Sequence, residues 1–80
     1  MLQSEKSRAT RQRLLNAAFK CLVRYGYFGT TTVAVCREAG VARGTMLHHF
    51  PNKESLVLAS LEDILERRVD DFTTTLDTLD

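Results

Sequence analysis

The chain has 80 residues, of which 44% are hydrophobic and 26% charged. This length allows one small domain and excludes a two-domain enzyme, and the composition is neither disordered nor collagen-like. The net charge of +1 is unevenly distributed along the chain. Residues 1–53 carry nine basic and two acidic side chains (net +7), and residues 54–80 carry two basic and eight acidic ones (net −6). The first part therefore suits a polyanionic partner and the last part does not.

Cysteine usage and hydropathy indicate a cytoplasmic protein. Cys21 and Cys36 lie in apolar helical stretches, which is typical of reduced, buried thiols rather than of a disulfide framework. The basic N-terminus is not followed by an apolar signal region, and no apolar run is long enough to span a membrane.

Hydrophobic spacing predicts a first helix over residues 8–25, ended by Gly26 because glycine enters left-handed conformations without penalty. Residues 1–7 are polar and are expected to form a loose arm. The basic residues there and just beyond either reach a phosphate or the minor groove, or form a disordered basic tail. These residues are Lys6, Arg8, Arg11 and Arg13.

A loop over residues 27–30 precedes hydroxyls that suit a helix N-cap, Thr30 to Thr32. A short helix is predicted over residues 32–39, broken by Gly40. Its β-branched residues are also compatible with a strand, but its shortness and the following Ala-Gly-Val favour helix, turn, helix.

A third helix is predicted over residues 42–49, weakly capped at Ala42 and ended by Pro51. Asn52 then caps a fourth helix, which ends near Arg67 or continues further. Its apolar residues recur every three or four positions: Leu58, Leu61, Leu65, Val69, Phe72, Leu76 and Leu79.

The second and third helices predict a helix-turn-helix, which needs small residues where its helices touch and apolar anchors facing inward. The small residues are Cys36, Ala39 and Gly40. The anchors are Val35, Val41, Met46 and Phe50. The outward positions are then Ala42, Arg43, Gly44, Thr45, Leu47 and His48.

The run AGVARGTMLHHFPNKESL over residues 39–56 resembles the N-terminal DNA-binding domain of the tetracycline-repressor (TetR) family. Upstream residues match at the family's spacing, namely Leu15, Ala17, Ala18, Phe19, Gly26, Tyr27, Thr30 and Thr31. The resemblance covers about residues 8–65. It implies an all-α fold, a three-helix helix-turn-helix domain followed by the start of a longer fourth helix.

The resemblance also implies a function. Family members are transcriptional regulators, usually repressors, that bind palindromic operator DNA as homodimers with the third helix in the major groove. Thr31, Thr32 and Lys53 are expected to hold phosphates. A C-terminal domain binds a small-molecule inducer and forms the dimer. We therefore expect an arm over residues 1–7, a DNA-binding domain over 8–66, and the beginning of the C-terminal domain over 67–80.

Each outward residue of the third helix has a DNA-binding interpretation and a plainer one. The Arg43 guanidinium fits guanine O6 and N7, or is simply solvated. Gly44 either permits close approach of the backbone to DNA or is merely tolerated, and Thr45 either contacts DNA or helps the helix to start. Leu47 stands where the family often has tyrosine, and it suits a thymine methyl instead. His48 is expected to face DNA.

Two further residues, at the end of that helix and just after it, also need an interpretation. His49 is expected to pack against the first or fourth helix. Lys53 either contacts a phosphate or is a solvated lysine. A cation at the start of a helix is disfavoured by the positive end of the helix dipole, so a lysine there is easier to explain if a bound polyanion offsets this repulsion.

The sequence contains no nucleophile motif, no Gly-rich phosphate loop and no zinc-ligand spacing, so no enzyme activity, cofactor or metal is expected. The alternative function is a protein-interaction module that uses the apolar face of the fourth helix.

Overall fold

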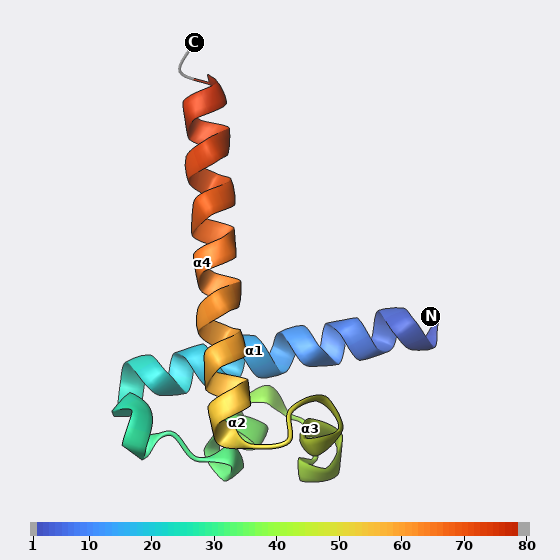
Figure 1. Cartoon of the computed structure of the whole chain (residues 1–80). Coiled ribbons are helices and arrows are strands. Elements are labelled where there is room, and N and C mark those ends of the chain that lie inside the picture. The colour runs from blue at the N-terminus through green and yellow to red at the C-terminus, as the bar shows by residue number, and fades with distance from the viewer. Residues whose placement is uncertain (1, 79–80) are drawn as a thin grey trace.

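The computed structural model describes residues 2–78 of the chain, which are arranged as four helices (Figure 1). They are α1 (Gln3–Gly29), α2 (Thr32–Ala39), α3 (Arg43–His49) and α4 (Lys53–Thr78). The described residues contain no strand, which confirms the predicted all-α class. In Figure 1, α1 crosses the molecule and α2 and α3 lie on one side of it, whereas α4 begins near α2, crosses α1 and rises on the other side.

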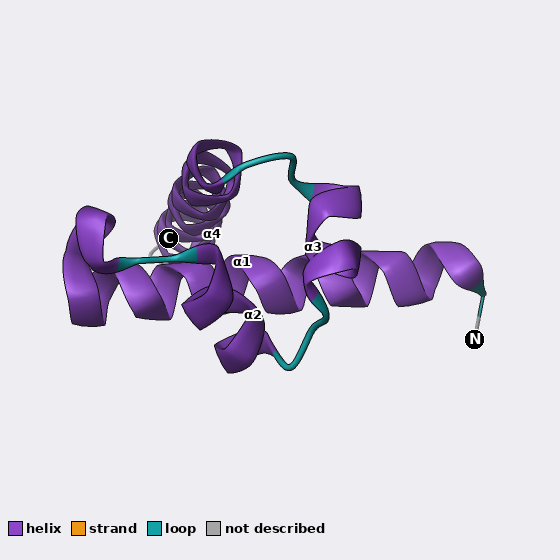
Figure 2. Ribbon diagram, turned by 90° about the horizontal axis from the view of Figure 1, so that it is seen from below, coloured by secondary structure: helices purple, strands orange, loops and turns teal. Residues whose placement is uncertain are grey.

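The core forms where α2, α3 and the first part of α4 pack on α1. Val35, Met46 and Phe50 are buried, as predicted for inward anchors, whereas Val41 and Cys36 are only partly buried. The remaining core side chains are Leu14, Leu15, Ala17, Ala18, Cys21, Ala39 and Leu56. Viewed from below in Figure 2, α2 and α3 lie in front of α1 while α4 runs away from the viewer.

The start of α1 differs from the prediction, because the helix begins at Gln3 rather than near Arg8. Residues 3–7 of the segment expected to be loose are therefore helical. The segment contains no residue that breaks a helix, because the first glycine of the chain is Gly26 and its first proline is Pro51. The Glu5 carboxylate accepts the Leu2 backbone N–H at 3.3 Å, satisfying a donor that would otherwise lack a partner in the first turn.

The end of α1 agrees with the prediction only in part, because Gly26 breaks the helix as predicted but residues 27–29 are helical. Gly26 interrupts the regular helix with φ 74° and ψ 176°, a conformation that glycine adopts readily. One more helical turn follows, so Tyr27–Gly29 is not the predicted loop. The turn ends at the buried Thr30, whose backbone is extended with φ −84° and ψ 115° and whose hydroxyl donates to the Gly26 carbonyl at 2.7 Å.

Several predicted caps are confirmed. The Thr31 hydroxyl accepts the Ala34 N–H at 3.1 Å, and the Asn52 side chain accepts the Ser55 N–H at 2.8 Å. Ala42 makes no side-chain cap for α3. Gly40 ends α2 in the left-handed conformation, φ 68° and ψ 38°. Local sequence therefore sets the boundaries of the short helices.

The fourth helix continues through the three threonines at 73–75 to Thr78, which resolves the open question of its length. Only its first part packs on the domain, with Leu56, Val57 and Ser60 buried. Its predicted apolar spacing forms an exposed stripe, called here the α4 stripe. The α4 stripe comprises Leu58, Leu61, Leu65, Val69, Phe72 and Leu76. Leu79, which also belongs to the predicted spacing, lies outside the described residues.

A polar cluster ties α4 to α1 near the point where the two helices part. Gln12 donates to the Asp63 carboxylate at 3.0 Å, and Arg67 pairs with Asp63 at 3.1 Å. The Arg67 guanidinium also donates to the Asn16 side chain at 3.3 Å. Beyond Arg67, every described residue of α4 is exposed.

We predict that Leu56→Ala lowers the free energy of unfolding by about 2–5 kcal/mol, because it leaves a cavity in the core. Leu58→Ala is the matched control on the same helix, because Leu58 is 59% exposed and Leu56 only 1%. We expect the control to change stability by less than about 0.5 kcal/mol. Urea unfolding followed by circular dichroism measures both, and equal losses would contradict this description of the core.

Candidate nucleic-acid interface

The turn between α2 and α3 is built on backbone hydrogen bonds. The Gly40 N–H donates to the Arg37 carbonyl at 3.3 Å, and the Val41 N–H donates to the Cys36 carbonyl at 3.0 Å. These bonds close the C-terminus of α2 while the chain changes direction. The result is two short helices joined by a three-residue turn over residues 40–42, as a helix-turn-helix requires.

The third helix has one buried side chain and an otherwise open surface. Met46 is completely buried, and Phe50, which follows the helix, is 4% exposed. These two residues hold α3 on the core and turn its remaining residues outward. The exposed residues are those predicted to face DNA: Arg43, Gly44, Thr45, Leu47 and His48.

Gly44 is the one residue of this α3 surface that has no side chain. A Cβ atom built there meets nothing within 4 Å, so the protein itself does not require glycine at this position. Glycine costs up to about 1 kcal/mol relative to alanine within a helix. The missing side chain leaves the backbone of α3 open to anything that approaches from outside.

The two histidines point into different surroundings, as their adjacency predicts. His48 is exposed and His49 is half-buried, with its ring centroid 6.3 Å from that of Phe50. The two imidazole rings meet edge to face at 5.4 Å. His48 therefore belongs to the outer surface of α3 and His49 to its boundary with the core.

The first turn of α2 presents polar hydrogen-bond donors. The Thr31 hydroxyl, while accepting the Ala34 N–H, keeps its own hydrogen to donate, and Thr31 is exposed. Thr32, the first residue of α2, is half-buried. The first backbone N–H groups of a helix lack intrahelical acceptors, so this end suits an anion such as phosphate.

Lys53 at the start of α4 is held by an aromatic ring. Its ammonium nitrogen lies 4.1 Å from the Tyr27 ring centroid, and the Tyr27 hydroxyl donates to the Glu54 carboxylate at 3.3 Å. Burial raises the pKa of Tyr27, and the Glu54 charge raises it further, so the phenol stays neutral and able to donate. Sequence reasoning missed Tyr27, because its contact with Lys53 depends on the kink at Gly26.

Arg13 is not part of a basic arm in the structure. Its guanidinium donates to the Ala39 carbonyl at 2.7 Å, beside the helix-turn-helix turn. No local signal in the sequence pointed there, because the contact joins residues 26 positions apart. Lys6, Arg8 and Arg11 are exposed on α1, although the Arg11 guanidinium carbon lies 5.2 Å from the Phe50 ring centroid.

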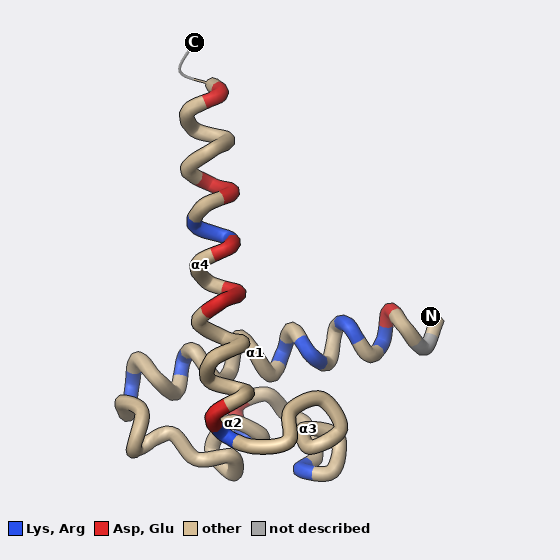
Figure 3. The backbone as a smooth tube through the Cα atoms, in the orientation of Figure 1, with Lys and Arg blue, Asp and Glu red and all other residues tan. Residues whose placement is uncertain are grey.

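Charge is separated in space as well as in sequence. Figure 3 shows lysines and arginines along α1, whereas the acidic residues gather along α4 as it rises away from α2 and α3. The acids of α4 therefore lie mostly far from the surface of α3, which lowers their repulsion of an anion bound there.

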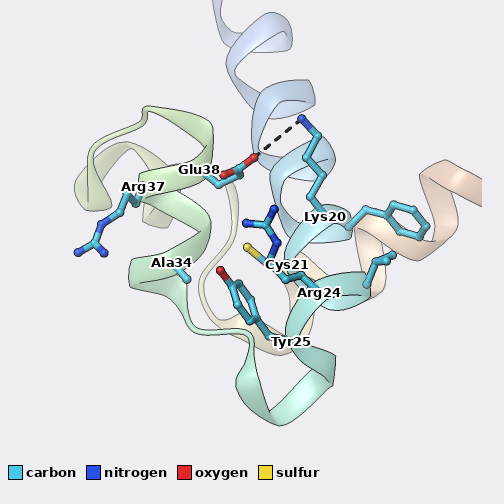
Figure 4. Close-up of a pocket in the computed structure, with 9 residues that line it drawn as sticks. Lys20, Cys21, Arg24, Tyr25, Ala34, Arg37 and Glu38 are labelled. Carbon is cyan, nitrogen blue, oxygen red and sulfur yellow. Dashed lines mark ion pairs between the residues drawn. The ribbon is translucent and has the colours of Figure 1, made fainter.

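A groove of about 480 Å³ lies elsewhere, between the second half of α1 and α2 (Figure 4). Cys21, Arg24 and Tyr25 face it, and Lys20 pairs with Glu38 at 3.9 Å across it. Burial raises the pKa of the Cys21 thiol; the Glu38 carboxylate raises it further, and Arg24 partly offsets this. None of the predicted site residues lines this groove.

Residues 2–78 lack features that two other kinds of site would need. No three or more His, Cys, Asp or Glu side chains cluster closely enough there to hold a metal ion. No described helix combines the length and hydropathy needed to cross a membrane.

Comparison with known proteins matches this helical arrangement to a family. The family model described as "Bacterial regulatory proteins, tetR family" matches residues 14–60, which include the whole helix-turn-helix. The chain belongs to this family. The resemblance recognised in residues 39–56 is thereby confirmed.

Similar proteins come from several bacteria. The chain is 40% identical to the HTH-type transcriptional regulator CymR of Pseudomonas putida over 81% of the chain and 32% of CymR. It is 35% identical to the HTH-type transcriptional regulator UidR of Escherichia coli over 82% of the chain and 33% of UidR. For the HTH-type transcriptional repressor AcnR of Corynebacterium glutamicum, identity is 38% over 69% of the chain and 29% of AcnR. The chain thus spans about a third of these relatives.

We predict that Gly44→Ala raises the free energy of unfolding by up to about 1 kcal/mol and weakens DNA binding several-fold. The methyl group fits the free protein, and we expect it to obstruct a DNA backbone or base edge that approaches α3 closely. Thermal unfolding and fluorescence anisotropy with labelled duplex measure the two effects. Unchanged affinity would mean that Gly44 is merely tolerated in α3.

Proposed function

We propose that this chain is the DNA-binding part of a TetR-family transcriptional regulator, which inserts α3 into the major groove of operator DNA. The exposed surface of α3, held from behind by Met46 and Phe50, carries the proposal. A major groove about 12 Å wide admits a helix, and α3 projects its polar residues away from the core. The family membership supports the same function.

Arg43 is the proposed reader of base sequence. It is the first residue of α3 and is exposed, so its guanidinium is free to reach a base edge. The two parallel N–H groups of a guanidinium match guanine O6 and N7, a contact that discriminates by about 1–3 kcal/mol against the wrong base. Thr45 and His48 lie exposed on the same short helix and are proposed to contact neighbouring bases or phosphates. Leu47, 45% exposed, suits a thymine methyl.

Phosphate contacts are proposed at the two helix starts that flank α3 in the sequence. Thr31 and Thr32 offer hydroxyl and backbone donors at α2, and Lys53 offers an ammonium group at α4. The cation–π contact with Tyr27 already restricts the Lys53 side chain, so less conformational entropy is lost when Lys53 binds a phosphate. Such contacts position a protein on DNA without reading its sequence.

The wider organisation of the protein is also a proposal. The name of AcnR as a repressor supports repression as the direction of regulation. The exposed α4 stripe supports residues 67–80 as the start of a C-terminal domain that forms a homodimer and binds a small-molecule inducer. We place the regulator in the cytoplasm, where bacterial operator DNA is found. The similar proteins are named as transcriptional regulators, which supports the proposal that this protein is not an enzyme.

We predict that Arg43→Ala lowers affinity for a duplex selected by this chain from random DNA by about 10–100-fold, and removes the base preference at one position. Arg37→Ala is the matched control, because Arg37 is an exposed arginine on α2 for which no base contact is proposed. Equal losses in the two variants would contradict base reading by Arg43.

We further predict that Lys53→Ala weakens binding to all duplexes alike and reduces the slope of log affinity against log salt by about one. Anisotropy titrations over a series of salt concentrations measure the slope. If the affinity of the unchanged chain for DNA is constant between about 50 and 200 mM salt, the proposed function is wrong, because phosphate contacts release counterions.

A further inference from the structure

The C-terminus of α2 leaves two carbonyl groups for a partner from outside the helix. The backbone bonds of the turn use the carbonyls of Cys36 and Arg37. The carbonyls of Ala39 and Gly40 instead accept from the Arg13 guanidinium of α1, at 2.7 Å and 3.4 Å from the same nitrogen. A side chain from one helix therefore holds the turn between two others.

Charge and geometry both favour this contact. The carbonyl end of α2 carries partial negative charge, which the guanidinium complements, and a hydrogen bond from a charged donor is stronger than a neutral one. A Cβ atom at Gly40 would lie 2.9 Å from the Arg13 nitrogen, so the guanidinium would have to shift if a larger residue stood there. The left-handed φ of 68° also favours glycine, so two constraints coincide at Gly40.

The first helix also contacts the other end of α3. Phe50 follows α3 directly, and the Arg11 guanidinium carbon lies 5.2 Å from its ring centroid. Arg13 thus contacts the turn before α3 and Arg11 the residue after it. With only seven residues, α3 takes its direction from these two ends and from Met46 between them.

We infer that Arg13 is a positioning residue for DNA recognition: it fixes the turn at Ala39 and Gly40, and thereby the angle at which α3 meets the major groove. It does so without contacting DNA itself. This inference rests on the proposed function and adds a determinant of sequence specificity that lies on α1, outside the helix-turn-helix. Release of the turn lets α3 tilt, which misplaces base contacts but leaves phosphate attraction in place.

The test compares Arg13→Gln, Arg13→Lys and Arg8→Gln, each measured by anisotropy on the selected duplex and on a scrambled duplex of the same composition. The quantity of interest is the ratio of the two affinities. We expect Arg13→Gln to lower this ratio about tenfold, the size of one charge-assisted hydrogen bond. Arg13→Lys keeps the charge and one donor group, so it should recover part of the ratio.

Arg8→Gln is the matched control, because Arg8 is exposed on the same helix and the change in charge is identical. It should weaken binding to both duplexes alike and leave the ratio unchanged. NMR supplies a direct readout: in Arg13→Gln, the amide signals of residues 40–45 should shift and those of residues 56–60 should not. Thermal unfolding confirms that each variant is folded, and Arg13→Lys carries the test if Arg13→Gln unfolds.

Three results would overturn the inference. Equal weakening on both duplexes in Arg13→Gln, fully restored by lysine, would make Arg13 a surface charge. A lower melting temperature with an unchanged ratio would make its role purely structural. Unmoved amide signals at residues 40–45 would separate Arg13 from the turn. If the unchanged chain itself does not distinguish the two duplexes, the proposed function fails instead.

Discussion

The architecture depends on the burial of Met46 and Phe50 against α1. A helix of seven residues is unstable alone in water, because the cost of nucleation exceeds the gain from so few hydrogen bonds. Tertiary packing must therefore stabilise α3, and it does so from one side only. The same packing that makes α3 stable leaves its other side open, so stability and an accessible polar surface have a common origin.

The first helix organises the rest of the domain. It contributes half of the core cluster, from Leu14 to Cys21, and its polar side chains reach both neighbouring parts of the fold. Arg13 holds the turn before α3, whereas Gln12 contacts Asp63 on α4. Adjacent residues of α1 thus connect it to the helix-turn-helix and to the long fourth helix.

The fourth helix has two parts with different physical character. Near its start, Leu56 and Ser60 are buried and Lys53 faces the Tyr27 ring. Beyond Arg67, its residues are exposed and acidic residues outnumber basic ones. The first part belongs to the small domain, and the second carries much of the apolar α4 stripe away from it.

Local chemistry made much of this protein predictable from its sequence. The period of apolar residues predicted four helices, and Gly40, Thr31 and Asn52 predicted their ends, because caps and left-handed glycines act within a few residues. The outward residues of α3 followed from the inward positions of Met46 and Phe50. The run of residues 39–56 indicated the family for the same reason: its spacing is set within one motif.

Contacts between distant residues were decided only by the tertiary structure. The hydrogen bonds of Arg13 to residues 39 and 40, and the contact of Lys53 with Tyr27, each join residues that are 26 or 27 positions apart. Periodicity places a side chain on a face of its helix but does not say which helix that face meets. For the same reason the spacing of the α4 stripe suggested an apolar face, yet only packing showed that Leu56 and Val57 are buried and the stripe exposed.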